Sequence, residues 1–308
     1  MPFRSILVPL DGSPEGEQAL PVAQMIAAQQ RAAVHLVHVH TPNDIISIEG
    51  MPVLDEQMHS LGREHEHVYL DRIAQPLRAE ASLTVTTAVL DHPVAPALLR
   101  YANENDIELL VLSSHGHGGF APAWLGSVAD TLVRNSHLPV LLVRPTNDVA
   151  QPLSVERVLV PLDGSAMGEQ VLPFALMLGS AARARYTLLH VINPSARARS
   201  ELQIDLPEDA DDAAEIEVQR VRAAERYLHT VAERLRADQA NVETRIVIEP
   251  QAATAILNEA QDGENSVIAL ATHGRGGVAR LLLGSVADKV VRGANVPVLL
   301  YRPQEEQA

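Results

Sequence analysis

The chain repeats one set of motifs twice, and this internal repeat constrains its fold more than any other feature of the sequence. Residues 6–13 read ILVPLDGS and residues 158–165 read VLVPLDGS, while GSVAD at 126–130 returns unchanged at 284–288. Repeats of solenoid proteins run to about 20–50 residues, so a repeat spanning half of this chain is a whole domain. The sequence therefore predicts two similar domains in tandem.

The boundary between the two copies falls in a polar stretch, residues 146–156, which contains one proline and shows no hydrophobic periodicity. The chain of 308 residues is long enough for two domains with a core each, since one domain commonly holds about 100–200 residues. We predict one domain over residues 1–146 and a second over residues 155–308.

Composition limits the class of protein. Hydrophobic residues make up 46% and charged residues 20% of the chain, which is typical of a globular protein. The lack of cysteine excludes a disulfide scaffold, a thiol nucleophile and a cysteine-ligated metal centre. A formal net charge of −15 argues against nucleic acid as a partner. With no apolar run of membrane-spanning length and no evident signal peptide, we expect a cytoplasmic protein without a membrane partner.

Strand-like and helix-like segments alternate within each copy. In the first copy, short apolar runs predict strands at 5–10, 34–39, 83–90, 109–114 and 139–145. Helical patterns lie between them, at 14–27, 64–79, 95–105 and 127–136. Such alternation predicts an α/β fold, in which each domain is a five-stranded parallel sheet with helices on both faces.

Open α/β sheets bind ligands at the carboxyl ends of their strands, at the point where strand order reverses. Two loops in each copy follow strands at this edge. The first loop contains Asp11-Gly12-Ser13 in one copy and Asp163-Gly164-Ser165 in the other. The second follows the fourth strand and reads SSHGHGG at 113–119 and ATHGRGG at 271–277. We expect the ligand site of each domain between these loops.

The loop after the fourth strand carries the more specific pattern. A glycine and a Gly-Ser pair are separated by nine residues, as Gly116 with Gly126-Ser127 and as Gly274 with Gly284-Ser285. Glycines let backbone N–H groups approach a phosphate, and the start of a helix attracts an anion. Gly-Ser can equally be an ordinary helix cap. Its occurrence twice in the same context favours a phosphate site.

These motifs resemble those of the universal stress protein family in its tandem two-domain form, and the resemblance covers nearly the whole chain. It rests on VPLDGS, on the HV pair in the second strand, on THGRGG followed by LLLGSVAD, and on the terminal PVLLYRP. The ATP-binding branch of that family carries G-x2-G-x9-G-[S/T]. Both halves match its last three elements, whereas Ser113 and Ala271 stand in place of the first glycine.

The resemblance implies two Rossmann-like domains that bind ATP with Mg²⁺. It implies that Asp11 lies beside the sugar and base, that Val39 contacts the base, and that a loop glycine and a triphosphate-binding turn follow. In the first domain, this glycine is Gly116 and the turn is Gly126, Ser127 and Val128. The matching residues of the second domain are Asp163, Val191, Gly274, Arg275, Gly284, Ser285 and Val286. His117 replaces Arg275 in the first half, so we expect the tighter site in the second domain.

The resemblance also implies that the domains form an intramolecular pseudo-dimer through the terminal strands, with a homodimer as a further assembly.

His38 recurs as His190, which indicates a structural role in the fold. Histidines at 59, 65 and 67 have no counterpart in the second copy, and we interpret them as part of a solvated helix.

Three functions stay open on the sequence. The first is a regulatory nucleotide-binding module of the stress response. The second is a stress-related scaffold without nucleotide, which Ser113 and Ala271 favour. The third, an ATP-hydrolysing enzyme, is the weakest. The only lysine, Lys289, lies within a predicted helix instead of a Walker loop, and no triad spacing is present, so we expect slow hydrolysis at most.

Overall fold

The structure is a computed structural model, and its chain divides into two compact units, Met1–Leu153 and Ser154–Ala308. The residues that it describes are 2–41, 45–48, 51–54, 56–79, 83–114, 125–145, 154–180, 182–194, 210–261, 265–272 and 283–304. We refer to the two units as the first and the second domain and describe each by itself.

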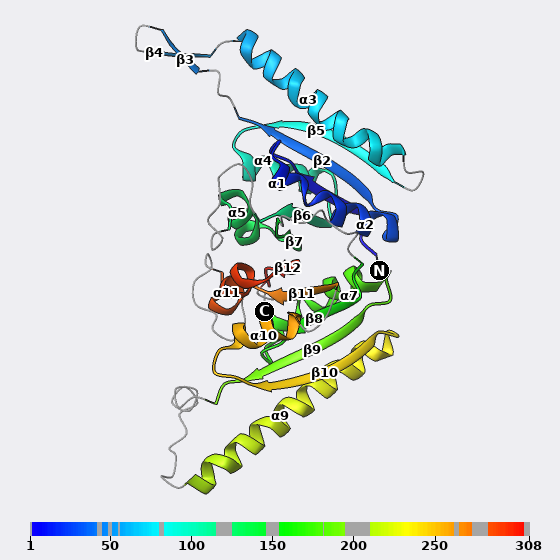
Figure 1. The fold of residues 1–308 in the computed structure, drawn as a ribbon, viewed down its shortest axis with the longest axis vertical. Helices are drawn as coiled ribbons and strands as arrows, with labels where there is room; N and C mark the ends of the chain where they lie inside the picture. The colour runs from blue at the N-terminus through cyan, green and yellow to red at the C-terminus, as the bar shows by residue number, and fades with distance from the viewer. Residues whose placement is uncertain are drawn as a thin grey trace. The chain divides into compact units, whose positions relative to one another are not determined.

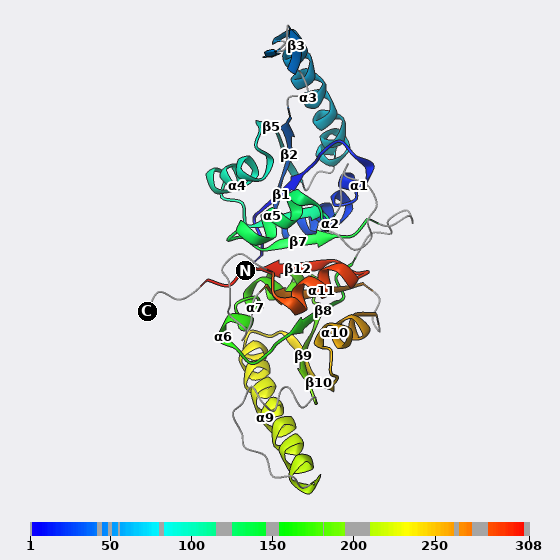
Figure 2. The ribbon, with the colours of Figure 1, turned by 90° about the vertical axis from the view of Figure 1, so that its left-hand side faces the viewer.

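In the first domain, five parallel strands form a sheet in the order β7-β6-β1-β2-β5 (Figure 1). Its strands are β1 (Ser5–Pro9), β2 (Ala33–His40), β5 (Thr84–Asp91), β6 (Leu109–Ser113) and β7 (Val140–Val143). Its helices are α1 (Pro14–Glu17), α2 (Leu20–Gln30), α3 (Glu56–Ala79), α4 (Val94–Glu104) and α5 (Ser127–Asn135). Figure 2 shows α1, α2 and α3 on one side of the sheet and α4 and α5 on the other.

The second domain repeats this plan, with parallel strands in the order β12-β11-β8-β9-β10. Its strands are β8 (Arg157–Pro161), β9 (Arg185–Ile192), β10 (Asn241–Ile248), β11 (Ser266–Ala271) and β12 (Val298–Tyr301). Its helices are α6 (Ala166–Glu169), α7 (Leu172–Ser180), α9 (Ala210–Ala237), α10 (Ala252–Gln261) and α11 (Ser285–Gly293). Helix α9 packs on β9 and β10, and α10 packs against α11.

The central strands β1 and β8 have apolar middles because helices cover both faces of each sheet. Ile6, Leu7 and Val8 of β1 have no exposed surface, and the same holds for Val158 and Leu159 of β8. The predicted fold class, two tandem α/β domains that each contain a five-stranded parallel sheet, is therefore confirmed.

The helix predicted over residues 14–27 is two helices. Helix α1 ends at Glu17 and α2 begins at Leu20. Pro21 lies in the first turn of α2, where its missing N–H cannot bond to the carbonyl of Glu17 and its ring would clash with that carbonyl. The second domain has the same break between α6 and α7, where Pro173 follows Leu172.

Two further differences lie after β2. A short antiparallel pair, β3 (Ile45–Ile48) and β4 (Met51–Leu54), was not predicted. Helix α3 begins at Glu56, two turns before the predicted start, because its buried face of Leu70, Ala74 and Leu77 marks only its second half.

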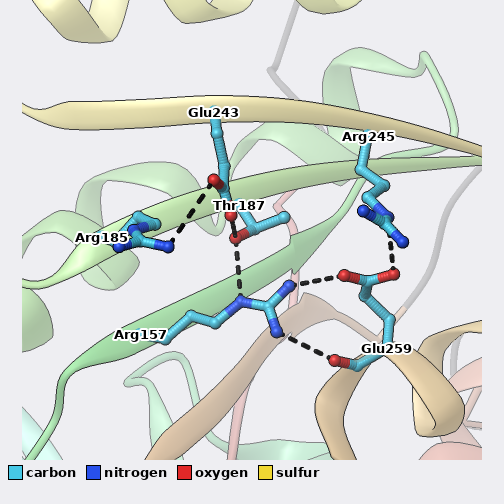
Figure 3. Close-up of polar contacts among 6 residues, drawn as sticks. All are labelled: Arg157, Arg185, Thr187, Glu243, Arg245 and Glu259. Carbon is cyan, nitrogen blue, oxygen red and sulfur yellow. Dashed lines mark hydrogen bonds and ion pairs between the residues drawn. The ribbon is translucent and has the colours of Figure 1, made fainter. Parts of the chain in front are cut away.

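A buried ion pair fixes α10 to the sheet of the second domain (Figure 3). Arg157, the first residue of β8, donates from Nη2 to Glu259 Oε1 at 2.6 Å and from Nη1 to the Glu259 carbonyl at 3.0 Å. Its Nε donates to Thr187 Oγ1 at 3.0 Å. The side chains of Arg157 and Glu259 are only 14% and 7% exposed, so each charge depends on the other for compensation.

Exposed charges extend this pair along the edge strand β10. Arg245 Nε lies 2.9 Å from Glu259 Oε2, and the Thr187 hydroxyl donates to Glu243 Oε1 at 2.6 Å. Arg245 is 58% and Glu243 45% exposed, so solvent screens these outer contacts. The energetic centre of the network is therefore the pair between Arg157 and Glu259.

The first domain replaces this ion pair by a neutral contact. Tyr101 and His35 occupy the positions of Glu259 and Thr187, and His35 Nδ1 lies 3.0 Å from the Tyr101 hydroxyl. Burial lowers the pKa of His35, which keeps its imidazole uncharged near neutral pH. The two copies thus share a fold but differ in one contact between helix and sheet. An ion pair joins α10 to the sheet of the second domain, and a neutral contact joins α4 to that of the first.

Candidate functional site

Strand order reverses beside the first strand of each domain. In the first domain the chain runs from β1 to β2 and β5 on one side, and then crosses to β6 and β7 on the other. The carboxyl ends of β1 and β6 therefore border the crevice in which open α/β sheets bind ligands. In the second domain the same place lies between β8 and β11. The two loops singled out in the sequence follow these strands.

The loop after the first strand holds an aspartate in a fixed position. Asp11 Oδ1 accepts hydrogen bonds from the Ser13 backbone N–H at 3.0 Å and from the Ser13 hydroxyl at 2.5 Å. Ser13 Oγ in turn accepts from the N–H of Gly16 at 3.0 Å and caps α1. Gly12 has a φ of 84°, a conformation that favours glycine. The turn thus holds a carboxylate directly after the carboxyl end of β1.

The second domain has the same geometry. Asp163 Oδ1 accepts from the backbone and the hydroxyl of Ser165 at 3.0 and 2.6 Å, and Ser165 Oγ accepts from the N–H of Gly168 at 3.0 Å. Gly164 has the same φ of 84° as its counterpart. The agreement between the two copies shows that the repeated Asp-Gly-Ser sequence dictates the turn.

A glycine in the following helix lets the helix approach the aspartate. A Cβ at Gly16 would lie 2.5 Å from Asp11 Oδ1, and one at Gly168 would lie 2.8 Å from Asp163 Oδ1. The two serines, Ser13 and Ser165, were not predicted as site residues. The same is true of the two glycines. Their signal was present, since DGS and GE recur at equal spacing in both copies.

The second loop of each domain ends at the start of a helix without a side-chain cap. Gly126 is the N-cap of α5, and its N–H donates to the Ser114 carbonyl at 2.9 Å. Gly284 is the N-cap of α11 and its N–H donates to the Thr272 carbonyl at 2.8 Å. Because no side chain caps either helix, the N–H groups of the first turn are available to an anion.

The residues after these glycines lie at the surface. Ser127 and Ser285 are exposed, Val128 is half-buried, and Val286 is 37% exposed. The structure thus places the predicted triplets Gly126–Val128 and Gly284–Val286 at accessible helix starts. Gly116, Gly274 and Arg275 lie outside the described residues, so their assignment stays a prediction.

The second strand of each domain carries a histidine and a valine near its carboxyl end. Val39 and Val191 are the last-but-one residues of β2 and β9, and Val39 is buried while Val191 is half-buried. His38 Nδ1 lies 2.8 Å from the carbonyl of Leu10, directly before Asp11. His190 makes the same contact with Leu162 at 2.7 Å. These contacts confirm the structural role that we inferred from the recurrence of the histidine.

A tyrosine covers each of these histidines. The rings of Tyr69 on α3 and His38 lie edge to face, with centroids 6.2 Å apart, and Tyr227 on α9 lies in the same way against His190. Tyr69 donates to Glu17 Oε1 at 3.0 Å. Burial, together with nearby carboxylates, raises the pKa of both phenols far above the ordinary value.

We expect the folded protein to resist ionisation of its tyrosines. Burial raises the pKa of Tyr69, Tyr101, Tyr227 and Tyr301, and raises that of Tyr186 to about 12. The chain has five tyrosines in all. A pKa that is higher in the folded than in the unfolded state stabilises the fold below about pH 10 and loses this effect as the pH rises above it.

The measurement is a titration of tyrosinate absorbance, with the protein in guanidinium as control. The denatured chain should titrate near pH 10, and the native chain only above it, together with loss of circular dichroism. A native titration curve that coincides with the denatured one would contradict the burial of these phenols.

Within the described ranges, no group of three or more histidine, aspartate and glutamate side chains could hold a metal ion. None of the described helices has the length and hydropathy needed to span a membrane. His65 and His67 are exposed on α3, in agreement with a solvated helix.

The fold defines a class, that of proteins with two similar α/β domains in tandem. The profile of the universal stress protein family matches residues 2–144 and 154–302. The chain therefore belongs to the universal stress protein family, as the repeated motifs predicted.

Relatives of the same two-domain length support this assignment. A universal stress protein of Mycobacterium tuberculosis is 27% identical over 305 residues, which cover 96% of each chain. One from Mycolicibacterium smegmatis is 26% identical over 306 residues and 97% of each chain. The crystal structure of a universal stress protein from Archaeoglobus fulgidus superposes with a TM-score of 0.69 at 20% identity, over 97% of this chain and 98% of that one, which shows the shared fold.

Proposed function

We propose that the protein binds ATP with Mg²⁺ in its two crevices and acts as a regulatory module of the stress response. The observation that carries the proposal is the pairing of two features at the carboxyl ends of adjacent strands. A fixed carboxylate follows β1 and β8, and an uncapped helix start follows β6 and β11. Both domains repeat the pairing with the same geometry.

The chemistry of these groups fits a nucleotide. Backbone N–H groups at the starts of α5 and α11 can donate to phosphate oxygens, and the Ser127 and Ser285 hydroxyls add a further donor each. The carboxylates of Asp11 and Asp163 can accept from ribose hydroxyls. The backbone groups of Val39 and Val191, near the ends of β2 and β9, can contact a base.

The same donor set fits Mg²⁺ carried by the nucleotide. Mg²⁺ is commonly bound through one or two carboxylates together with phosphate oxygens and water. Asp163 in the second domain, or Asp11 in the first, can supply one carboxylate. When bound, the ion would neutralise phosphate charge next to an acidic side chain.

A scaffold without nucleotide is the alternative, and one observation favours it. Ser113 and Ala271 end β6 and β11 in register with Val143 and Tyr301, and each places a Cβ where the family motif has its first glycine. In this alternative the domains act through their surfaces. Pairing through strands 139–144 and 297–302, assembly into a homodimer and a cytoplasmic location stay predictions under either function.

The test is to purify the protein without added nucleotide, denature it, and identify the released small molecules by chromatography and mass spectrometry. Isothermal titration of the emptied protein with Mg-ATP follows. We expect ATP in the released fraction, or one or two binding events in the titration. An empty fraction together with no heat of binding would replace this proposal by the scaffold.

A further inference from the structure

The first domain carries a cluster of ionisable side chains beside its crevice, formed by His38 and His40 of β2 and Glu66 of α3. His40 Nδ1 lies 2.8 Å from Glu66 Oε1, and His38 Nε2 lies 3.4 Å from the same oxygen. The side chains of His40, His38 and Glu66 are 4%, 14% and 18% exposed. The cluster joins the end of the second strand to α3.

Hydrogen bonding fixes where the protons of His38 can be. Its Nδ1 lies 2.8 Å from the Leu10 carbonyl, which can only accept, so Nδ1 carries a hydrogen. In a neutral His38, Nε2 would then carry a lone pair and would lie 3.4 Å from Glu66 Oε1 without a proton to donate. The contact is attractive only when one further proton lies between Nε2 and Oε1.

The carboxylate itself also requires compensation. Glu66 Oε2 is buried and has no hydrogen-bond partner among the described residues. A buried carboxylate with one unsatisfied oxygen is costly unless positive charge lies close to it. An imidazolium at His38 would supply that charge, because Nε2 lies 3.4 Å from Glu66 Oε1.

The second domain has the same frame without the cluster. His190 binds the Leu162 carbonyl as His38 binds that of Leu10, and Tyr227 covers His190 as Tyr69 covers His38. Counted from these matched residues, the position of His40 is Ile192 and that of Glu66 is Ala224. Both are apolar and buried, at 6% and 5% exposure. The chain therefore contains its own control.

Other groups pack around the cluster. From α3, Tyr69 lies against the His38 ring, and Arg63 is paired with Asp91 of β5. Glu17 of α1 accepts from Tyr69, and Asp11 is near enough to raise the pKa of Tyr69.

The backbone of α3 lies close to the cluster. A Cβ at Gly62 would lie 3.3 Å from His40 Cε1, so the ring has little room to move unless α3 moves with it.

We propose that the contact between β2 and α3 in the first domain is proton-linked through the His38–Glu66–His40 cluster. Loss of the shared proton turns the contact between Nε2 and Oε1 from attraction into repulsion and loosens α3 on the sheet. Because the other nitrogen of His38 binds the carbonyl before Asp11, the same event disturbs the turn that presents Asp11 to the crevice.

The experiment is hydrogen–deuterium exchange of the full-length protein without nucleotide, at about pH 6 and about pH 8. Rates are corrected for the intrinsic pH dependence of amide exchange. We expect exchange of the α3 segment 60–70 to rise about tenfold at the higher pH, as the loss of one partly buried ion pair would cause. The matching segment 218–228 of α9 should show no comparable rise.

Variants decide whether the cluster is responsible. The double variant His40→Ile with Glu66→Ala copies the second domain and should abolish the pH dependence of segment 60–70. Glu66→Gln alone keeps an acceptor and removes the charge, and it should also abolish the pH dependence. It serves as the test if the double variant fails to fold. Equal pH dependence in both segments of the wild-type protein, or its persistence in these variants, would overturn the proposal.

A second measurement links the cluster to the crevice and rests on the proposed nucleotide binding. The affinity of the first domain for Mg-ATP should be higher at about pH 6 than at about pH 8, and that of the second domain should change less. If neither domain binds Mg-ATP at either pH, the proposed function fails while the exchange result still stands. Binding in the first domain that is independent of pH would overturn the link.

Discussion

Replacement of Glu259 by glutamine is expected to lower the free energy of unfolding of the second domain by about 3–5 kcal/mol, the usual effect of leaving one partner of a buried ion pair alone. Arg157 would keep its charge at 14% exposure with no carboxylate beside it. The measurement is urea unfolding followed by circular dichroism, combined with hydrogen exchange of α10. An early transition should separate from that of the first domain.

The outer carboxylate of the same network provides the matched control. Glu243 is 45% exposed and interacts with Arg185 at 4.0 Å, so Glu243→Gln should change the stability by less than about 1 kcal/mol. Tyr101→Phe, which removes the neutral counterpart in the first domain, should cost about 1 kcal/mol. Equal effects of Glu259→Gln and Glu243→Gln would show that the pair with Arg157 is not the centre of the network.

Gly284→Val is expected to weaken Mg-ATP binding in the second domain by roughly 10- to 100-fold, as lost hydrogen bonds to a charged group would do. Its backbone lies at φ −57° and ψ 148°, a region open to any residue, so the fold should persist. The side chain would stand where N–H groups face the crevice. Calorimetric titration with Mg-ATP measures the loss.

Asp163→Ala should weaken the same site by a similar factor, and Asp163→Asn separates the two roles of the side chain. The amide can still accept from Ser165, while its charge is gone. Gly126→Val and Asp11→Ala act as controls, because they alter only the first domain. Unchanged affinity in both Gly284→Val and Asp163→Ala would show that the site lies elsewhere.

The sequence was sufficient for the architecture because its signals are local. Strand and helix alternate with clear periodicity, and Asp-Gly-Ser dictates a turn whose contacts span only two or three residues. The split of the helix after β1 could have been predicted as well, since Pro21 and Pro173 mark it.

Contacts between distant residues could not be predicted in the same way. Arg157 and Glu259 are 102 residues apart, and His40 and Glu66 are 26 apart on different elements. Neither pair recurs in the other copy, so the repeat gave no signal for them. The two copies carry different residues at these positions, and the partners of these residues are known only from the folded structure.

The short helix after β1 has a consequence for how any ligand can lie. Helix α1 contains four residues and α5 nine, so the stronger of the two dipoles at the crevice is that of α5. An acidic side chain stands at the α1 end, and free N–H groups stand at the α5 end. The crevice is therefore electrically polar along its length. We therefore expect an anionic group to bind toward the start of α5, and a hydroxyl group or a cation to bind toward Asp11.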